Sequence, residues 1–544
     1  MNLTTSRRRH RQVRQSEQRM YAPVANLAVR NRWIALLVLC LAELLVSIDN
    51  TIVNVALPSI SRQLAASTSG LQWIVDAYTL VFAGLLLAAG HLGDRLGRRR
   101  VLLAGMIGFG ATSAVAASVT TLGPLIGARA VMGAFAALIF PATLALLTNI
   151  FTVAKERVVA IGIWSAIAGV AVALGPVSGG YLLEHYSWAS VFWVNVPMAV
   201  VAVAVTLRWV PESRAEQVGR LDVAGTLLSV AGITVLVWSV IEGPQHGWAS
   251  ALSLAAFALA AVLLVAFAAW ELRVSNPILN VALFANRRFS AAAGAISIAF
   301  FGLFGFIFLI TQYFQAVKGY GTLDAGLRTL PFALVIGATA PLAVQLAQRF
   351  GAATVITTGL VLMSAGFAVA STSQIDTAYF GRIIVAMMLM AGGLGLITGP
   401  ATESIMTVLP LREAGAGSAV NDTTREIGGT LGVAVMGSVL VSLYGGRVRS
   451  ALEGLPLPTG ARSLAMSSVT GGLDVARVTS DPQLATQVQN AFIDGLHAAS
   501  LVAAAATLAG AVIVAVTLPA RRSRPEATGP ATARSVALAS SRQP

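Results

Sequence analysis

About fourteen apolar runs, each long enough to cross a lipid bilayer as a helix, occupy most of this 544-residue chain. Inside a bilayer no water is present to bond exposed backbone groups, so only helices or closed barrels can cross it. The runs are longer and more uniformly apolar than barrel strands. We therefore predict an all-α polytopic membrane protein. The expected spans are centred near Cys40, Leu80, Gly110, Phe135, Gly169, Ala199, Gly232, Ala258, Phe304, Gly337, Gly359, Met390, Val433 and Ala509.

The composition agrees with this class. Charged residues make up 11% of the chain and hydrophobic residues 56%, whereas an ordinary soluble domain is about 25% charged. The first run begins near Trp33 and is long enough to span, so we expect it to stay in the mature protein and not to act as a cleaved signal. Abundant Ala, Gly and Arg with little Lys favour a high-GC bacterium. We therefore expect a multi-pass protein of the bacterial inner membrane.

Lys and Arg are divided unevenly between the two sets of alternate loops, and the formal net charge is +14. The other short loops hold Arg62, Lys318 and little other positive charge. Because cytoplasmic loops retain positive charge, we expect both termini in the cytoplasm, including the C-tail with Arg521, Arg522 and Arg524. The charge then reflects topology and lipid contact, and we expect no nucleic-acid binding. The richer set of loops and the N-tail hold Arg7, Arg8, Arg9, Arg11, Arg14, Arg95, Arg98, Arg99, Arg100, Lys155, Arg157, Arg208, Arg214, Arg220, Arg273, Arg287, Arg288, Arg349 and Arg412.

Several kinds of chemistry are excluded by what the chain contains. Cys40 is the only cysteine, so an intrachain disulfide or a Cys-based metal site is impossible. The five histidines are scattered without metal-ligand spacing, and no GxxxxGK[ST] phosphate loop occurs. We therefore expect no enzyme activity, no cofactor and no metal. The energy for any transport has to come from an ion gradient.

A faint internal repeat predicts two related halves. Residues 346–351 (L-A-Q-R-F-G) align with residues 92–97 (L-G-D-R-L-G), and transporters are commonly built from related halves with the substrate site between them. A chance match in a Gly-rich chain is the alternative. The expected layout is a basic cytoplasmic N-tail (1–32), a six-helix bundle (33–208), two inserted helices with their loops (209–286), a second six-helix bundle (287–518) and a cytoplasmic C-tail (519–544).

One long connection, residues 445–497, is rich in Gly, Ser, Thr and Pro. Asp481 and Pro482 form a plausible N-cap and first-turn pair, and apolar residues follow at helical spacing over 484–496. We expect this helix to run directly into the last span. The rest of the connection is expected to be a plain solvated connector, with a lid or a partner-binding role as the alternative.

Ionisable residues inside the apolar runs indicate where the mechanism lies. A charge at mid-membrane costs about 3 kcal/mol on insertion scales and normally faces an aqueous path. The first run holds Glu43 and Asp49, the second holds Asp76, and the fourth holds Arg129. The later runs hold Arg382, Glu403, Asp422, Arg425 and Glu426.

A charged turn joins the second and third runs at residues 90–100. Its pattern, G-x-L-x-D-R-x-G-R-R, resembles the loop between the second and third spans of the major facilitator superfamily of secondary transporters. The resemblance implies a major facilitator fold, with two six-helix bundles plus two inserted helices here. It also implies a conformational latch, in which a carboxylate at a helix N-terminus is stabilised by about 0.3–1 kcal/mol. A simple positive-inside anchor is the alternative. The latch residues are Gly90, Asp94, Arg95, Gly97, Arg98 and Arg99.

Further motifs are similar to the fourteen-span drug:proton antiporter group of that superfamily. In combination they extend over nearly the whole membrane region. They are D-x-T-x-V-N-V-A-L-P from Asp49, W-I-V-x-A-Y from Trp73, R-A-V-M-G from Arg129, G-P-V-S-G-G from Gly175, F-W-V-N-V-P from Phe192 and Q-Y-F-Q from Gln312.

The fifth span has a nearly flat face, because Ala171, Gly175 and Gly179 lie at i, i+4 and i+8. Pro176 bends the helix at this point, and Gly180 extends the small-residue segment. The resemblance implies that this antiporter packing motif seals the membrane between the states that exchange their ligands. Ordinary tight packing is the alternative.

Asp49 is the expected proton carrier, tuned by Arg129, with Glu43 as a further candidate. Burial favours the protonated acid and a nearby guanidinium favours the carboxylate, so a change in their distance can load and release a proton. A structural hydrogen bond at the end of a broken helix is the alternative for Asp49. Asp76 is the second candidate for the proton, or faces a cationic substrate, as the resemblance implies. The expected substrate contacts are Asp76, Trp73, Tyr78, Gln312 and Gln315.

These observations together predict a proton-driven antiporter that exports hydrophobic, cationic drugs or antibiotics by alternating access. Its partners are a small-molecule substrate, protons and the lipid bilayer, and we expect a monomer. The first alternative is an exporter or flippase for one endogenous metabolite or lipid, which would show narrow specificity. The second is a membrane receptor or scaffold, which would bind substrate without pH-dependent flux.

Overall fold

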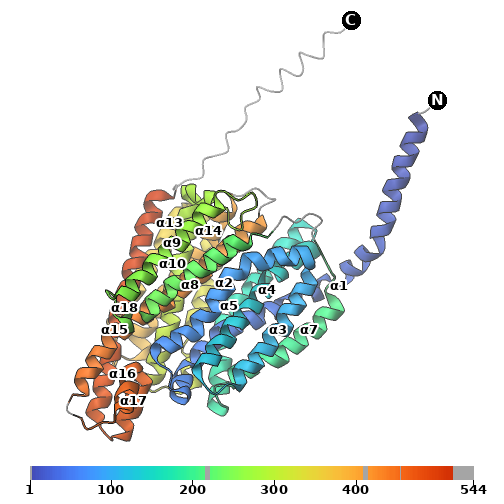
Figure 1. Cartoon of the computed structure of the whole chain (residues 1–544). Helices are drawn as coiled ribbons and strands as arrows, with labels where there is room; N and C mark the ends of the chain where they lie inside the picture. Colours follow the sequence, from blue (N-terminus) through green and yellow to red (C-terminus); the bar gives the residue numbers. More distant parts are fainter. Residues whose placement is uncertain (1–2, 215–220, 409–413, 454, 519–544) are drawn as a thin grey trace.

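The computed structural model describes residues 3–214, 221–408, 414–453 and 455–518, and this part of the chain is helical without a strand (Figure 1). Fourteen of the described helical segments are long and apolar enough to cross a membrane. The predicted all-α polytopic fold class is therefore confirmed. The predicted C-tail (519–544), Arg220 and Arg412 lie outside the described residues, as do the side chains of the N-tail arginines.

The helices fall along the chain into a first group, an inserted pair and a second group. The first group is α1 (Leu3–Leu64), α2 (Thr68–Leu96), α3 (Arg98–Ser118), α4 (Leu122–Ile150), α5 (Ala154–His185), α6 (Ser190–Trp193) and α7 (Asn195–Trp209). The inserted pair is α8 (Val223–His246) and α9 (Ala251–Glu271). The second group is η1 (Val281–Ala285), α10 (Arg287–Gln312), η2 (Tyr313–Val317), α11 (Thr322–Leu327), α12 (Leu330–Phe350), α13 (Ala352–Ala370), η3 (Tyr379–Ile383), α14 (Ile384–Met406), α15 (Ala414–Ala451), α16 (Thr459–Ser467), α17 (Val469–Val478) and α18 (Pro482–Thr517).

Each group packs mainly within itself. In the first, α1 packs on α5, α2 and α3 pack on α4, and α7 packs on α3. In the second, α10 packs on α15, α14 packs on α12 and α13, and α18 packs on α13 and α15. The two groups meet where α2 contacts α15 and where α5 contacts α11. Of the inserted pair, α8 lies against both α2 and α15, so it spans the junction of the groups.

The two predicted repeat turns have the same backbone conformation. Gly97 follows α2 with φ +111°, and Gly351 follows α12 with φ +90°. Each glycine N–H donates to the carbonyl four residues earlier, in Gly93 and Ala347 respectively. Glycine adopts positive φ without the steric penalty of a Cβ, which explains why the glycine of the repeat occurs in both turns. The predicted division of the chain at residues 208 and 287 stays a prediction.

The long connection of residues 445–497 corrects one expectation. Residues predicted to be a plain solvated connector form α16 and α17, and Val469, Val475 and Ala476 are buried. The amphipathic periodicity of these short helices buries one side against the bundle. The predicted start of the last helix is confirmed, since the Asp481 carboxylate accepts from the backbone N–H groups of Gln483 and Leu484.

The bundle has two distinguishable ends. We call the end with α16 and α17 the hairpin end and the end with the α2–α3 turn at Gly97 the turn end. Figure 1 shows that the beginning of α1 projects from the end of the bundle opposite α16 and α17. By the expected topology, the turn end is cytoplasmic.

Candidate functional site

Asp49 and Arg129 form a buried ion pair in the middle of the first group. The Arg129 guanidinium lies 2.5 Å from Asp49 Oδ2, and the two side chains are 1% and 0% exposed. The Asn195 amide, at the start of α7, donates to Asp49 Oδ1 over 2.8 Å and also donates to Ser113 Oγ on α3. Side chains of α4 and α7 therefore bond both oxygens of this α1 carboxylate.

Arg129 is fixed by more than its carboxylate partner. Its Nε donates to the Ile74 carbonyl on α2 over 3.1 Å, and its guanidinium lies 4.2 Å from the centre of the Tyr78 ring. A cation over an aromatic face is stabilised by the ring quadrupole. When one partner of a buried ion pair is lost, the other is left as an uncompensated buried charge. A substitution of either Asp49 or Arg129 alone is therefore expected to destabilise the fold.

Glu43, the third proton-coupling candidate, is placed apart from this ion pair. Ser47 Oγ donates to Glu43 Oε1 over 3.0 Å, and Oε2 has no hydrogen-bond partner among the described residues. The side chain is 1% exposed. Its electrostatic partners are Asp422, Arg425 and Glu426 of α15.

The candidates on α2 point in different directions. Trp73 Nε1 donates to Glu242 on the inserted helix α8 over 2.9 Å, whereas Tyr78 lies beneath Arg129. Asp76 is completely buried, and in the described part of the chain neither of its carboxylate oxygens has a hydrogen-bond partner. The structure therefore does not bring these three residues together.

The two glutamines on the ninth span, Gln312 at the end of α10 and Gln315 in η2, have partners on different helices. Gln312 Nε2 donates to Phe308 within its own helix. Gln315 Nε2 donates over 2.9 Å to the Val55 carbonyl on α1, which joins the two groups of helices. Both side chains are buried.

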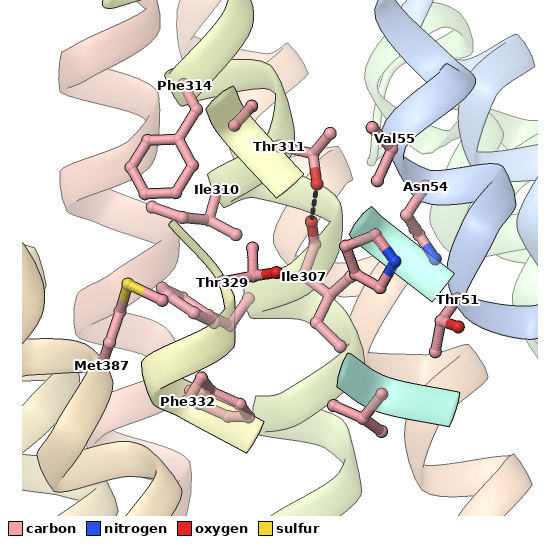
Figure 2. Close-up of a pocket in the computed structure, with 14 residues that line it drawn as sticks. Thr51, Asn54, Val55, Ile307, Ile310, Thr311, Phe314, Thr329, Phe332 and Met387 are labelled. Atoms are coloured by element: carbon pink, nitrogen blue, oxygen red, sulfur yellow. Dashed lines mark hydrogen bonds between the residues drawn. The ribbon is translucent and has the colours of Figure 1, made fainter. Parts of the chain in front are cut away.

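A pocket lies between the two groups and is lined by α1, α5, α10, η2, α11, α12 and α14 (Figure 2). Its lining is mostly apolar and aromatic, with a few hydroxyl and amide groups, the usual character of a site for a small hydrophobic molecule. None of the five predicted substrate contacts lines it. The lining residues are Thr51, Asn54, Val55, Val172, Pro176, Phe306, Ile307, Ile310, Thr311, Phe314, Ala325, Thr329, Phe332 and Met387.

The glycines of α5 allow close approach of two neighbouring helices. A Cβ at Gly175 would lie 2.0 Å from Thr51 Oγ1 on α1, and a Cβ at Gly180 would lie 2.6 Å from the Thr322 carbonyl on α11. A Cβ at Gly179 would lie 2.7 Å from Ile52 Cγ1. The small residues are therefore required by contacts with both groups of helices, and these contacts lie toward the hairpin end.

The α2–α3 turn makes its described contacts within the first group. Asp94 pairs with Arg98 at 2.8 Å, and the Arg99 guanidinium donates to the Leu207 carbonyl over 2.6 Å. The backbone N–H of Arg99 donates to Glu212. A latch would need a partner in the second group, so the latch role stays a prediction.

The family model of the Major Facilitator Superfamily matches residues 39–433, which cover most of the helices described above. The chain belongs to this superfamily. This superfamily consists of transporters, so the predicted fold and transporter class are confirmed. The chain is a multi-pass membrane protein.

Two curated superfamily relatives and one solved structure extend the comparison. The chain is 38% identical to the "Multidrug efflux pump LfrA" of Mycolicibacterium smegmatis over 89% of this chain and 96% of that protein. It is 32% identical to the "Methyl viologen resistance protein SmvA" of Salmonella typhimurium over 83% and 90%. A bacterial homologue of the human lysosomal transporter Spinster, solved inward-facing and unoccupied, has a similar fold, with a TM-score of 0.62 at 17% identity over 89% of this chain and 96% of that chain.

Sequence reasoning missed three residues that contribute to this major facilitator site. Thr51 and Asn54 line the pocket, and Asn195 bonds the buried carboxylate of Asp49. Thr51 and Asn54 lie in the motif that begins at Asp49, and Asn195 lies in the motif that begins at Phe192. The available signal is an uncharged polar side chain inside an apolar run.

Proposed function

We propose that this transporter exports hydrophobic, cationic drugs or antibiotics in exchange for protons, by alternating access across the bacterial inner membrane. The observation that carries the proposal is the buried Asp49–Arg129 pair, with its 2.5 Å contact and its Asn195 support. In this proposal the protein acts as a monomer with both termini in the cytoplasm.

Proton coupling follows from the two protonation states of Asp49 in this ion pair. If Asp49 takes up a proton, Arg129 loses its counter-charge but keeps the Ile74 carbonyl and the Tyr78 ring. The guanidinium can then move away from the acid without becoming wholly unpartnered. Because Arg129 of α4 is also held by α2, and Asp49 of α1 is bonded from α4 and α7, protonation changes the forces between helices.

The described hydrogen bonds that join the two groups support an alternating-access cycle. They lie toward the hairpin end or near the middle of the helices, and examples are Thr68 with Ser467, Gln72 with Ala434, and Thr322 with Gly180. This arrangement closes the path at the hairpin end. Opening it requires these bonds to break and the two groups to rotate about the pocket between them.

The pocket and the relatives support the substrate class. The apolar, aromatic lining suits a hydrophobic molecule. Names of relatives include multidrug efflux and methyl viologen resistance, and methyl viologen is an organic dication. One proton moving down about 150 mV releases about 3.5 kcal/mol, which supports a gradient of a few hundred-fold for an uncharged substrate. Exchange of one proton for a monovalent cation is electroneutral and is driven by the pH difference alone.

Ethidium movement into inverted membrane vesicles under an imposed pH gradient tests this function. We expect gradient-dependent uptake by the parent protein and loss of that uptake in Asp49→Asn. Asp76→Asn reports separately on the second acid. If a well-expressed parent takes up no ethidium under the gradient, drug:proton antiport is contradicted, and metabolites and lipids become the substrates to test.

A further inference from the structure

A second pocket lies inside the second group of helices, and we call it the side pocket. It is lined by α10, η2, α13, α14, α15 and α18 and by the segment that follows α13. The pocket between the groups is lined by α1 and α5 as well. Phe306 and Ile310 lie one turn apart on α10 and line both pockets. These two side chains therefore form the partition between the pockets.

The Phe306 ring is held by aromatic contacts alone. It is stacked with Phe332, with 5.9 Å between the ring centres and 24° between the ring planes. It also meets Phe367 edge-on, with 6.4 Å between the centres. Since no hydrogen bond holds the ring, its rotation breaks only dispersion and ring–ring contacts. Such a rotation would join the side pocket to the pocket between the groups.

The segment between α13 and η3 covers the side pocket at the hairpin end. Ser373 of this segment lines the pocket, and its carbonyl accepts a hydrogen bond from His497 on α18. The Gln374 carbonyl accepts from the Tyr313 hydroxyl over 2.8 Å. Lys318 donates to two further carbonyls of the segment, over 2.7 and 2.9 Å. Because this cover is fixed, a substrate reaches the side pocket from the pocket between the groups.

The lining of the side pocket suits an uncharged group. None of its described lining residues is an Asp, Glu, Lys or Arg, and most are aliphatic or aromatic. Ser373 and Ser500 also line it and are 4% and 2% exposed. Neither serine hydroxyl has a hydrogen-bond partner among the described residues. A buried hydroxyl without a partner is unfavourable, and a ligand oxygen that accepts from it removes this cost. The pocket therefore suits an apolar ring that carries an oxygen acceptor.

We propose that the side pocket is a second substrate subsite, which binds an uncharged ring substituent with an oxygen acceptor while the rest of the substrate lies in the pocket between the groups. This subsite deepens the proposed function and rests on it. Phe306 turns aside to admit the ring, and Ser373 and Ser500 supply the hydroxyl donors. Among substrates with the same cationic part, the transporter then favours those whose substituent reaches past Phe306.

The test compares three probes that share a triphenylphosphonium cation and differ in a methyl, a benzyl or a 4-acetylbenzyl substituent. Their binding to the full-length protein in lipid nanodiscs is measured calorimetrically, and protein-free nanodiscs set the background. The parent should bind the benzyl probe about tenfold or more tightly than the methyl probe, because the added ring is buried. The 4-acetylbenzyl probe should bind about two- to tenfold more tightly again, the range expected for a neutral hydrogen bond.

Variants of the lining assign these differences to the side pocket. Ser500→Leu on α18 and Ala386→Leu on α14 each fill the pocket. Each should lower the affinities for both benzyl probes to near that for the methyl probe. Ser373→Ala with Ser500→Ala keeps the space and removes both hydroxyls, so only the advantage of the acetyl group should disappear.

Two controls separate these results from damage to the fold. Leu501→Phe adds bulk at a neighbouring position of α18 that is 55% exposed, and it should leave the binding of all three probes unchanged. Affinity for the methyl probe is the internal control, because this probe does not reach past Phe306. It should stay at the parent value in Ser500→Leu and in Ala386→Leu.

Equal affinities of the parent for the three probes would overturn the subsite. So would benzyl and acetyl advantages that persist in Ser500→Leu, in Ala386→Leu and in the double serine variant, since the side pocket would then hold water only. If the parent still takes up ethidium under a pH gradient in that case, the proposed antiport stands and only this assignment fails. Absence of binding of all three probes by the parent, joined to absence of gradient-driven ethidium uptake, would remove both proposals.

Discussion

Asp49 and Arg129 carry opposite charges in a place where neither is exposed to water. A single substitution therefore does two things at once, because it removes a proton carrier and leaves its partner uncompensated. Breaking a buried pair costs about 3–5 kcal/mol, whereas neutral residues that replace both partners are often tolerated. Loss of transport in Asp49→Asn alone would not separate these two effects.

The double variant Asp49→Asn with Arg129→Gln separates loss of the proton carrier from loss of charge compensation. We expect Asp49→Asn alone to lower the thermal stability of the purified protein, and the double variant to recover most of that loss. Both proteins should lack pH-driven uptake of ethidium. A double variant no more stable than Asp49→Asn would show that the ion pair is not the main interaction of either side chain.

Asn195 offers a milder change at the same carboxylate. Asn195→Ala removes the donor to Asp49 Oδ1, and a hydrogen bond to a charged group is worth about 1.5–3 kcal/mol. We expect the initial rate of pH-driven ethidium uptake to fall about tenfold or more. Ser113→Ala is the control, since Ser113 contacts Asn195 and has no bond to Asp49. Equal rates in Asn195→Ala and Ser113→Ala would contradict the role given to the amide.

Residues of the candidate site could be predicted from sequence to different degrees. Asp49 and Arg129 are predictable because a charge in an apolar run requires a partner. The partners of Trp73 and Asp76 are not, because the sequence does not show which neighbour a helix face meets. The contact of Trp73 with Glu242 depends on where α8 packs, and this placement depends on tertiary structure.

At the scale of elements, the packing of α5 gives a sharp prediction. Gly175→Ala places a methyl group 2.0 Å from Thr51 Oγ1, so α1 and α5 have to separate. We expect a loss of transport of tenfold or more, because overpacking costs about 1–3 kcal/mol. Gly169→Ala is the matched control on the same helix, since a Cβ there meets nothing within 4 Å. The measurement is the rate of ethidium transport by the two variants at equal expression. Normal activity in Gly175→Ala would contradict the packing role.

Long helices could be predicted from sequence more completely than short ones. A spanning helix has to be apolar over its length, and this requirement made the fourteen candidate spans visible. The helices α16 and α17 have nine and ten residues and bury only one side, so their sequence resembles that of a polar loop. Tertiary contacts such as that of Ser61 with Ser468 place α16 and α17 beside the α1–α2 connection, and the local sequence does not show these contacts.

For the whole molecule, alternating access predicts that the hairpin end has to open during each cycle. Thr68 Oγ1 donates to the Ser467 carbonyl across the two groups over 3.1 Å. We expect a disulfide between Thr68→Cys and Ser467→Cys, made in a Cys40→Ser background, to abolish ethidium transport. Reduction with dithiothreitol should restore it. Unimpaired transport by the cross-linked protein would contradict opening at this end, and each single cysteine variant serves as the control.

The most direct measurement of the central claim is proton movement during ethidium entry into proteoliposomes that contain a pH-sensitive dye. If protons leave the lumen in exchange for entering ethidium, the lumen becomes alkaline when ethidium is added outside proteoliposomes that contain the parent protein. The Asp49→Asn with Arg129→Gln variant should show no alkalinisation, and protein-free liposomes set the background. Ethidium entry through the parent protein without any change in lumenal pH would contradict proton antiport.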